Sequence, residues 1–364
     1  MTIFYLGILF NGCILYAILH FAKKKFSINS NFIIFFISYS VITIFLFNLF
    51  YGTKFPDSNW LLYYADKFRD LNFSTESNSF SIFFGANLLS IPPFIIVNDP
   101  STAAFVSKFF LLMIFFYLKF NKLITNNLFV LSLFLPSLAI YSSFFLRETL
   151  ILFICFVFLN EAIKKKIIIP ILFLIILFFL RELQSFIFIL IIFIYFFSPR
   201  NKLKIFSVYF FGILIAIIFS HHYFKILNYE IEVMHLEDGE VIFNQFNKFD
   251  LFFLSKFFEG MIRSLTVIKP IEITSLKGII YLLEATILNL ILFYLVVQNI
   301  KIKNYKIINI VVFYLIICGF YGLIISNSST LHRYKLSTTL PIILLAFNQT
   351  YQIKKNNVWR IRNN

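Results

Sequence analysis

Two copies of one tetrapeptide carry the charges best placed to do chemistry in this chain. Phe-Leu-Arg-Glu stands at residues 145–148 and again at 179–182, each time between two apolar runs. Inserting an arginine near hydrocarbon costs roughly 2.5 to 3.5 kcal/mol, so two in matching positions indicate an anion to bind. The guanidinium groups of Arg147 and Arg181 suit phosphate or pyrophosphate, because a planar fork bonds two oxygens and keeps its charge. The alternative is that both are helix-end residues reaching toward the headgroups.

A glutamate follows each arginine and is a candidate supporting residue. Neighbouring residues of a helix point in different directions, so Arg147 is not expected to pair with Glu148. A contact between helices, such as Arg147 with Glu182, is the expected pairing.

Two aspartates lie in the polar segment 51–81 and are candidates for a general base. Deprotonating a hydroxyl needs a positioned carboxylate or imidazole, which Asp57 or Asp66 can supply. The plainer alternatives are that Asp57 caps a helix and that Asp66 lies on a solvated face.

A second candidate set lies near the end of the chain, at His332-Arg333-Tyr334. His332 competes with the aspartates as base or acid. Arg333 is a third candidate phosphate ligand, with Tyr334 in support. Both charged side chains can also be read as solvated loop residues.

The composition predicts an all-α polytopic membrane protein. Hydrophobic residues make up 60% and charged residues only 13% of the 364, with 54 Phe, which is far from a soluble domain. One span needs about 20 apolar residues, so the chain has room for about eleven transmembrane helices in a single integral membrane domain, 1–364. The net charge of +15 sits mostly in lysine clusters between apolar runs. That pattern places the N-terminus outside and the C-terminus in the cytoplasm, and we expect no nucleic-acid partner.

The expected spans follow from the apolar runs and the lysine clusters. They are residues 2–22, 31–50, 101–118, 128–144, 149–163, 167–180, 183–197, 205–220, 278–298, 307–325 and 336–347. Residues 82–97 are short and broken by Pro92-Pro93, so we expect a re-entrant or interfacial segment, with a full span as the alternative.

Two larger external loops, 51–81 and 221–277, are expected to carry interfacial helices. In the first loop, apolar residues recur at helical spacing from Leu61 to Leu71. In the second, Phe253, Phe257, Met261 and Leu265 recur in steps of four, which predicts an amphipathic helix resting on the outer leaflet.

No cofactor or metal is expected. Cys13, Cys155 and Cys318 are scattered in apolar runs without metal-ligand spacing, and we expect packed thiols. His221, His222 and His235 match no compact metal site. Without a glycine-rich nucleotide loop, the energy for a reaction has to reside in the substrate, as it does in a lipid-linked pyrophosphate.

Residues 136–150, Pro-Ser-Leu-Ala-Ile-Tyr-Ser-Ser-Phe-Phe-Leu-Arg-Glu-Thr-Leu, resemble the EpsG/Wzy-type oligosaccharide repeat-unit polymerases. In these, an outward helix led by proline ends at an arginine that opens the next helix. The segments Pro56–Trp60 and Tyr63–Asp66 are similar to the acidic first loop of that group and, more loosely, of GT-C glycosyltransferases. Arg333-Tyr334 before the last span is a further similarity, whereas Glu148 stands where the family commonly has glutamine.

The resemblance implies a GT-C-like membrane enzyme of bacterial surface polysaccharide synthesis, such as O-antigen, lipopolysaccharide or capsule. It would transfer a growing glycan from polyprenyl (undecaprenyl) pyrophosphate onto the next lipid-linked repeat unit, at the external face of the inner membrane. Arg147, Arg181 and Arg333 would bind the pyrophosphate, and an aspartate or His332 would take the proton. A chain-length regulator stays open as a further partner.

Two other functions remain open from the sequence. One is a GT-C glycosyltransferase with a polyprenyl-phosphate sugar donor, favoured by the acidic first loop. The other is a transporter or flippase of lipid-linked glycans, against which we count the near absence of charge within the expected spans.

Overall fold

The computed structural model describes most of the chain as α-helix. The described residues are 2–51, 56–70, 80–94, 100–164, 166, 168–182, 184–185, 188–189, 220–237, 244–266, 276–302, 305–325 and 327–362. Every element among them is helical, as expected. They fall into two compact units, one of Met1–Glu161 with Lys166–Phe186 and the other of Ala162–Lys165 with Ile187–Asn364.

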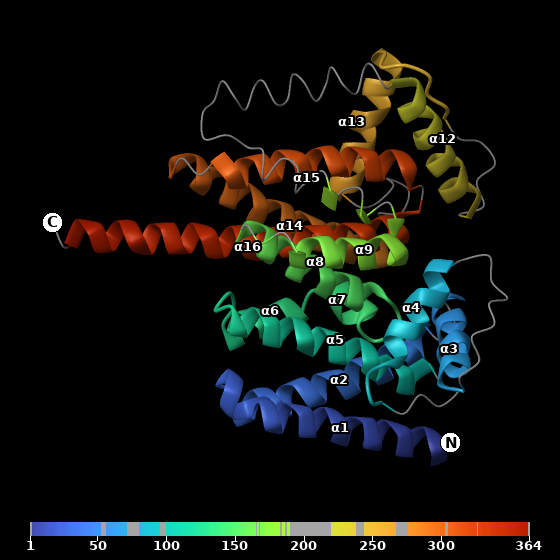
Figure 1. Cartoon of the computed structure of the whole chain (residues 1–364), viewed down its shortest axis with the longest axis vertical. Coiled ribbons are helices and arrows are strands. Elements are labelled where there is room, and N and C mark those ends of the chain that lie inside the picture. Colours follow the sequence, from blue (N-terminus) through green and yellow to red (C-terminus); the bar gives the residue numbers. More distant parts are fainter. Residues whose placement is uncertain are drawn as a thin grey trace. The chain divides into compact units, whose positions relative to one another are not determined.

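Three long apolar helices form the frame of the first unit: α1 (Thr2–Phe26), α2 (Ser30–Tyr51) and α5 (Pro100–Phe120). They lie along one another (Figure 1). Phe32 of α2 stacks on Phe115 of α5 at 4.6 Å between ring centroids. Asn11 of α1 donates to the carbonyl of Thr102, which buries a polar side chain with its partner.

Two shorter helices, α3 (Pro56–Arg69) and α4 (Phe80–Ser90), pack side by side (Figure 1). The helix expected within 51–81 is therefore confirmed. Helix α4 has 11 residues and rises about 16 Å, roughly half of a hydrocarbon core. It ends two residues before Pro92, since a proline cannot continue the hydrogen-bonding pattern.

The expected span 128–144 is not one continuous helix, because the chain forms two short helices there. They are α6 (Asn126–Leu133) and α7 (Pro136–Tyr141). Leu135 is extended, with φ −63° and ψ 120°, as the residue before a proline prefers. Residues 142–147 then leave the helix until α8 (Glu148–Ile163) begins, and α9 (Ile168–Leu180) follows.

The second unit contains α12 (Ser220–Glu237), α13 (Leu251–Thr266), α14 (Leu276–Lys301), α15 (Tyr305–Ile324) and α16 (Ser328–Arg362). Helix α13 confirms the amphipathic helix, but the expected apolar face packs on protein. Phe253 is buried against Phe224 of α12, and Phe257 lies against Gly319 of α15. Apolar side chains on other faces of α13, including Leu251, Phe258 and Ile262, are exposed.

The alternative that His332 and Arg333 lie in a loop is wrong, because both residues lie in the first turns of α16. The Asn327 side chain accepts from the backbone N–H of Thr330 and so starts the helix early. Pro341 lies within α16 and does not end it.

Four described helices are long and apolar enough to cross a membrane: Leu6–Phe26, Ser30–Phe47, Ser101–Phe120 and Gly278–Lys301. They indicate a membrane protein. The expected spans 183–197 and 205–220 fall almost entirely outside the described residues. The total of about eleven therefore stays a prediction.

Candidate functional site

Arg147 stands at the end of the irregular segment 142–147 and joins two other elements of the first unit. Its Nη1 donates to Ser81 Oγ of α4 at 3.0 Å and to the carbonyl oxygen of Leu180 at 3.0 Å. Gly85 of α4 leaves room beside it, since a Cβ there would lie 3.6 Å from Arg147 Cδ. Arg147 is thus held between α4 and the end of α9.

Arg181 forms a buried ion pair next to this contact. Its Nη2 donates to Glu148 Oε1 at 3.0 Å, and the two side chains are 2% and 5% exposed. Arg181 directly follows Leu180, whose carbonyl Arg147 binds, so the two tetrapeptide copies meet in space.

The expected ion pair between the two tetrapeptide copies was Arg147 with Glu182, but the observed pair uses the other arginine and the other glutamate. Arg181 pairs with Glu148, while Glu182 is exposed. Glu148 opens α8, where the helix N-terminus favours a carboxylate.

Lys108 is a buried ionisable residue that was not among the predicted site residues. It lies in the apolar run of α5, is 0% exposed, and donates from Nζ to Ser142 Oγ at 2.8 Å and Ser143 Oγ at 3.1 Å. The Nζ also lies 4.6 Å from the centroid of the Tyr39 ring. A lone lysine inside a span was the available signal, because ionisable residues there are functional candidates by default.

Ser107, next to Lys108, holds the same segment through its backbone. Its Oγ donates to the carbonyl of Phe144 at 2.7 Å and accepts from the N–H of Leu146 at 3.4 Å. Two consecutive residues of α5 therefore fix the irregular segment that presents Arg147 and Glu148.

Asp66 lies near the end of α3 and is partly buried. Burial raises the pKa of its carboxyl, against a smaller lowering by the charge of Arg69. Arg69 Nη2 donates to the carbonyls of Ser90 at 3.2 Å and Pro92 at 3.3 Å, at the end of α4. Asp57 is the second residue of α3, inside the helix and not at the N-cap position that precedes it, and its side chain lies outside the described residues.

His332 is buried in the second unit and faces a carboxylate that the sequence analysis also missed. Its Nε2 lies 3.4 Å from Glu284 Oε2 of α14, and its ring stacks on Tyr281 at 4.4 Å. The two side chains are 3% and 0% exposed. The alternative of a solvated His332 is therefore wrong. A carboxylate beside an imidazole orients the ring.

The neighbours of His332 have different surroundings. Tyr334 is buried and meets the Tyr321 ring edge to face at 5.7 Å. Arg333 is only partly buried. Because Arg333 belongs to the second unit and the other two arginines to the first, convergence of all three stays a prediction.

Cys155 and Cys318 are buried, as expected for packed thiols, whereas Cys13 is exposed on α1. Gln184 Nε2 lies 3.5 Å from Cys155 Sγ. This contact is close to the Arg181–Glu148 pair, because Cys155 lies in α8 with Glu148 and Gln184 follows Arg181 by three residues.

The first-unit site brings two guanidinium groups and one carboxylate together in an apolar setting. Such a site can attract an anion and stabilise negative charge as it develops. Comparison of this chain with known protein families, with curated proteins and with solved structures finds no match.

Proposed function

We propose that the chain is a glycosyltransferase that polymerises polyprenyl-pyrophosphate-linked oligosaccharide repeat units at the external face of a bacterial inner membrane. The observation that carries the proposal is the meeting of Arg147 with the Leu180–Arg181 segment inside an all-helical, apolar unit. The sequence resemblance rests on the same residues.

In this proposal a hydroxyl of the acceptor repeat unit attacks the anomeric carbon of the growing glycan. The bond from that carbon to the pyrophosphate oxygen breaks, and the pyrophosphate leaves with an added negative charge. Arg147 faces this charge, because a guanidinium bonds two oxygens at once. Arg181, already paired with Glu148, acts mainly by holding that arrangement.

The proton of the attacking hydroxyl passes to a side-chain base. Asp66 is one candidate, since its raised pKa makes the carboxylate a stronger base than an ordinary aspartate. His332 is the other, with Glu284 stabilising the imidazolium that forms. Asp57 and Arg333 remain further candidates for base and phosphate ligand.

The test is to size lipid-linked glycans in cells that carry the Arg147→Gln variant. We expect single repeat units to accumulate and long chains to fall at least about 100-fold, as when an oxyanion-stabilising donor is lost. Arg147→Lys should restore only part of the chain length, because it keeps the charge and loses the fork.

Lys24→Gln, in the exposed last turn of α1, is the matched control and should leave chain length unchanged. Long chains made normally by Arg147→Gln protein at wild-type abundance would contradict the proposal. Loss of one sugar with normal chain length would favour the GT-C alternative.

Transport of lipid-linked glycans is a second candidate function. The argument against it was the near absence of charge within the expected spans, and two buried ionisable residues weaken that argument. Lys108 and Glu284 are both 2% exposed or less, inside helices long enough to span. Buried ionisable residues of this kind also line transport pathways. A lipid-scrambling assay with the reconstituted chain separates this function from glycan transfer.

A further inference from the structure

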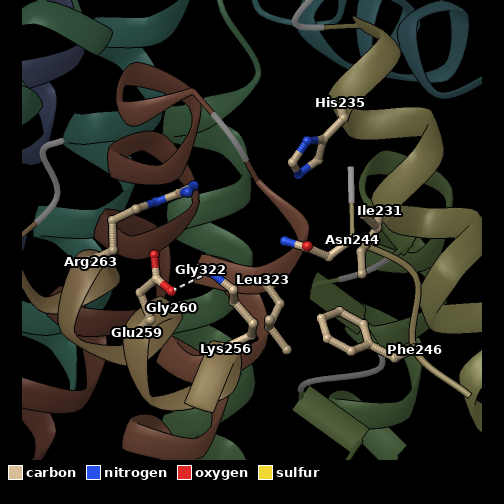
Figure 2. A pocket seen from close by; sticks show the side chains of 10 residues that line it. All are labelled: Ile231, His235, Asn244, Phe246, Lys256, Glu259, Gly260, Arg263, Gly322 and Leu323. Atoms are coloured by element: carbon tan, nitrogen blue, oxygen red, sulfur yellow. Dashed lines mark hydrogen bonds and ion pairs between the residues drawn. The ribbon is translucent and has the colours of Figure 1, made fainter. Parts of the chain in front are cut away.

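A polar cavity lies within the second unit among α12, α13 and α15 (Figure 2). Its volume is about 80 Å³, and its lining is Ile231, His235, Asn244, Phe246, Lys256, Glu259, Gly260, Arg263, Gly322 and Leu323. One water occupies about 30 Å³ of liquid, so the space exceeds a single water molecule. A small polar group fits there.

One face of α13 provides most of the polar lining. Lys256, Glu259, Gly260 and Arg263 follow at steps of three, one and three residues, which groups them on one side of the helix. At Gly260 the backbones of α13 and α15 touch, because a Cβ there would lie 2.9 Å from the carbonyl carbon of Gly322. Lys256 and Arg263 stand one turn to either side of this contact.

Among the described lining residues, two cations, Lys256 and Arg263, stand against one acid, Glu259. Arg263 extends toward the space from α13, His235 reaches it from α12, and the Asn244 amide points into it from a third direction (Figure 2). Lys256 pairs with Glu259 at 2.8 Å, but that carboxylate is 65% exposed. Such a surface pair is weak, so the lysine can turn to a ligand at little cost.

We propose that this cavity binds the phosphate group of a phosphate monoester or diester. The guanidinium of Arg263 matches two phosphate oxygens, Lys256 adds positive charge, and a ring nitrogen of His235 can donate a hydrogen bond. The Asn244 amide can donate a further hydrogen bond. This site is independent of the glycan transfer proposed above.

A neighbouring groove gives room for the rest of such a ligand. The groove has a volume of about 590 Å³ and shares the lining residue Phe246 with the cavity. Its other lining residues are Phe224, Lys225, Asn228, Tyr229, Glu232, Gln245 and Asn247. Asn228 fixes the wall between the two spaces, since its side chain donates to the carbonyl of Phe246 at 2.7 Å and accepts from its N–H at 2.8 Å. The part of the ligand beyond its phosphate can therefore occupy this groove.

The test is thermal unfolding of the purified full-length chain in a non-ionic detergent, with inorganic phosphate against chloride at equal ionic strength. We expect phosphate to raise the unfolding midpoint in a saturable way, and chloride not to do so. Arg263→Gln should raise the half-saturating phosphate concentration at least about tenfold. Lys248→Gln, an exposed lysine outside both linings, is the matched control and should bind like wild type.

Equal midpoints in phosphate and chloride, or unchanged half-saturation in a folded Arg263→Gln protein, would overturn the proposal. If Arg263→Gln does not fold, Lys256→Gln and Asn244→Ala take its place. Unchanged half-saturation in both would then overturn it.

A second experiment tests whether the bound phosphate belongs to a lipid headgroup or to a soluble phosphate ester. Micelles containing phosphatidylglycerol are compared with micelles containing neutral diacylglycerol. Protection by phosphatidylglycerol that competes with inorganic phosphate and is lost in Arg263→Gln supports a lipid headgroup as the ligand. Protection by inorganic phosphate alone supports a soluble phosphate ester.

Discussion

The Arg147–Arg181 site of the first unit and the Glu284–His332 pair of the second unit hold ionisable side chains in different ways. In the first, Arg147 and Arg181 stand where helices end, and Arg147 binds the backbone carbonyl of Leu180. In the second, Glu284 and His332 stand within the continuous helices α14 and α16 and face each other through side chains.

The difference follows from where backbone groups are available. The last carbonyls of a helix have no partner within it, so they can accept from a cation. Inside a helix these groups are already bonded, and a buried charge needs another side chain. Lys335 fits the same rule, because it donates to the carbonyl of Leu265 in the last turn of α13, at 3.0 Å.

The largest effect is expected from breaking the ion pair of the first unit. Glu148→Gln leaves Arg181 buried without its carboxylate, and an arginine cannot lose its proton. We expect the free energy of unfolding, measured by mixed-micelle titration, to fall by about 3–5 kcal/mol. The double variant with Arg181→Gln should recover much of this loss, and a single variant as stable as wild type would contradict the pairing.

The contact between α13 and α15 gives the next prediction, in the second unit. At Gly322 an added methyl would overlap the backbone of Gly260, so Gly322→Ala should destabilise the protein by about 1–3 kcal/mol or more. The measurement is the same titration. Gly85→Ala is the control in the first unit, because its Cβ would meet its nearest neighbours at 3.5 to 3.7 Å, an ordinary contact distance.

A smaller fall in the free energy of unfolding is expected when Glu284, the buried acid of the second unit, is replaced. Glu284→Gln should cost only about 1–2 kcal/mol, because histidine can be neutral and the amide can still hydrogen-bond to it. Equal losses for Glu284→Gln and Glu148→Gln would remove the distinction drawn between the two units.

The smallest effect on the free energy of unfolding is expected at Gly12 in α1, where the substitution should stabilise the protein. Nothing lies within 4 Å of a Cβ at this position, so Gly12→Ala should stabilise the helix by about 0.5–1 kcal/mol. A destabilising result would show a close contact at this face of α1.

Some features of the site were predictable from spacing alone. The repeat of Phe-Leu-Arg-Glu led to the expectation that both arginines reach one place, and the structure brings them together. Which glutamate pairs with which arginine was not predictable, because that depends on the turn between α7 and α8. Lys108 and Glu284 were not predictable as site residues, since each stands alone in an apolar run and its partners lie on other segments.

Composition and apolar periodicity by themselves determined that this chain is helical and suited to a membrane, because these properties depend only on nearby residues. The position of Pro136 likewise marks a break in a helix, through the geometry of its own ring. Only the tertiary structure decided that Arg181 pairs with Glu148, that Ser107 and Lys108 hold the segment before Arg147, and that His332 meets Glu284. Each of these depends on residues distant in sequence being packed together, and local preference carries no information about that.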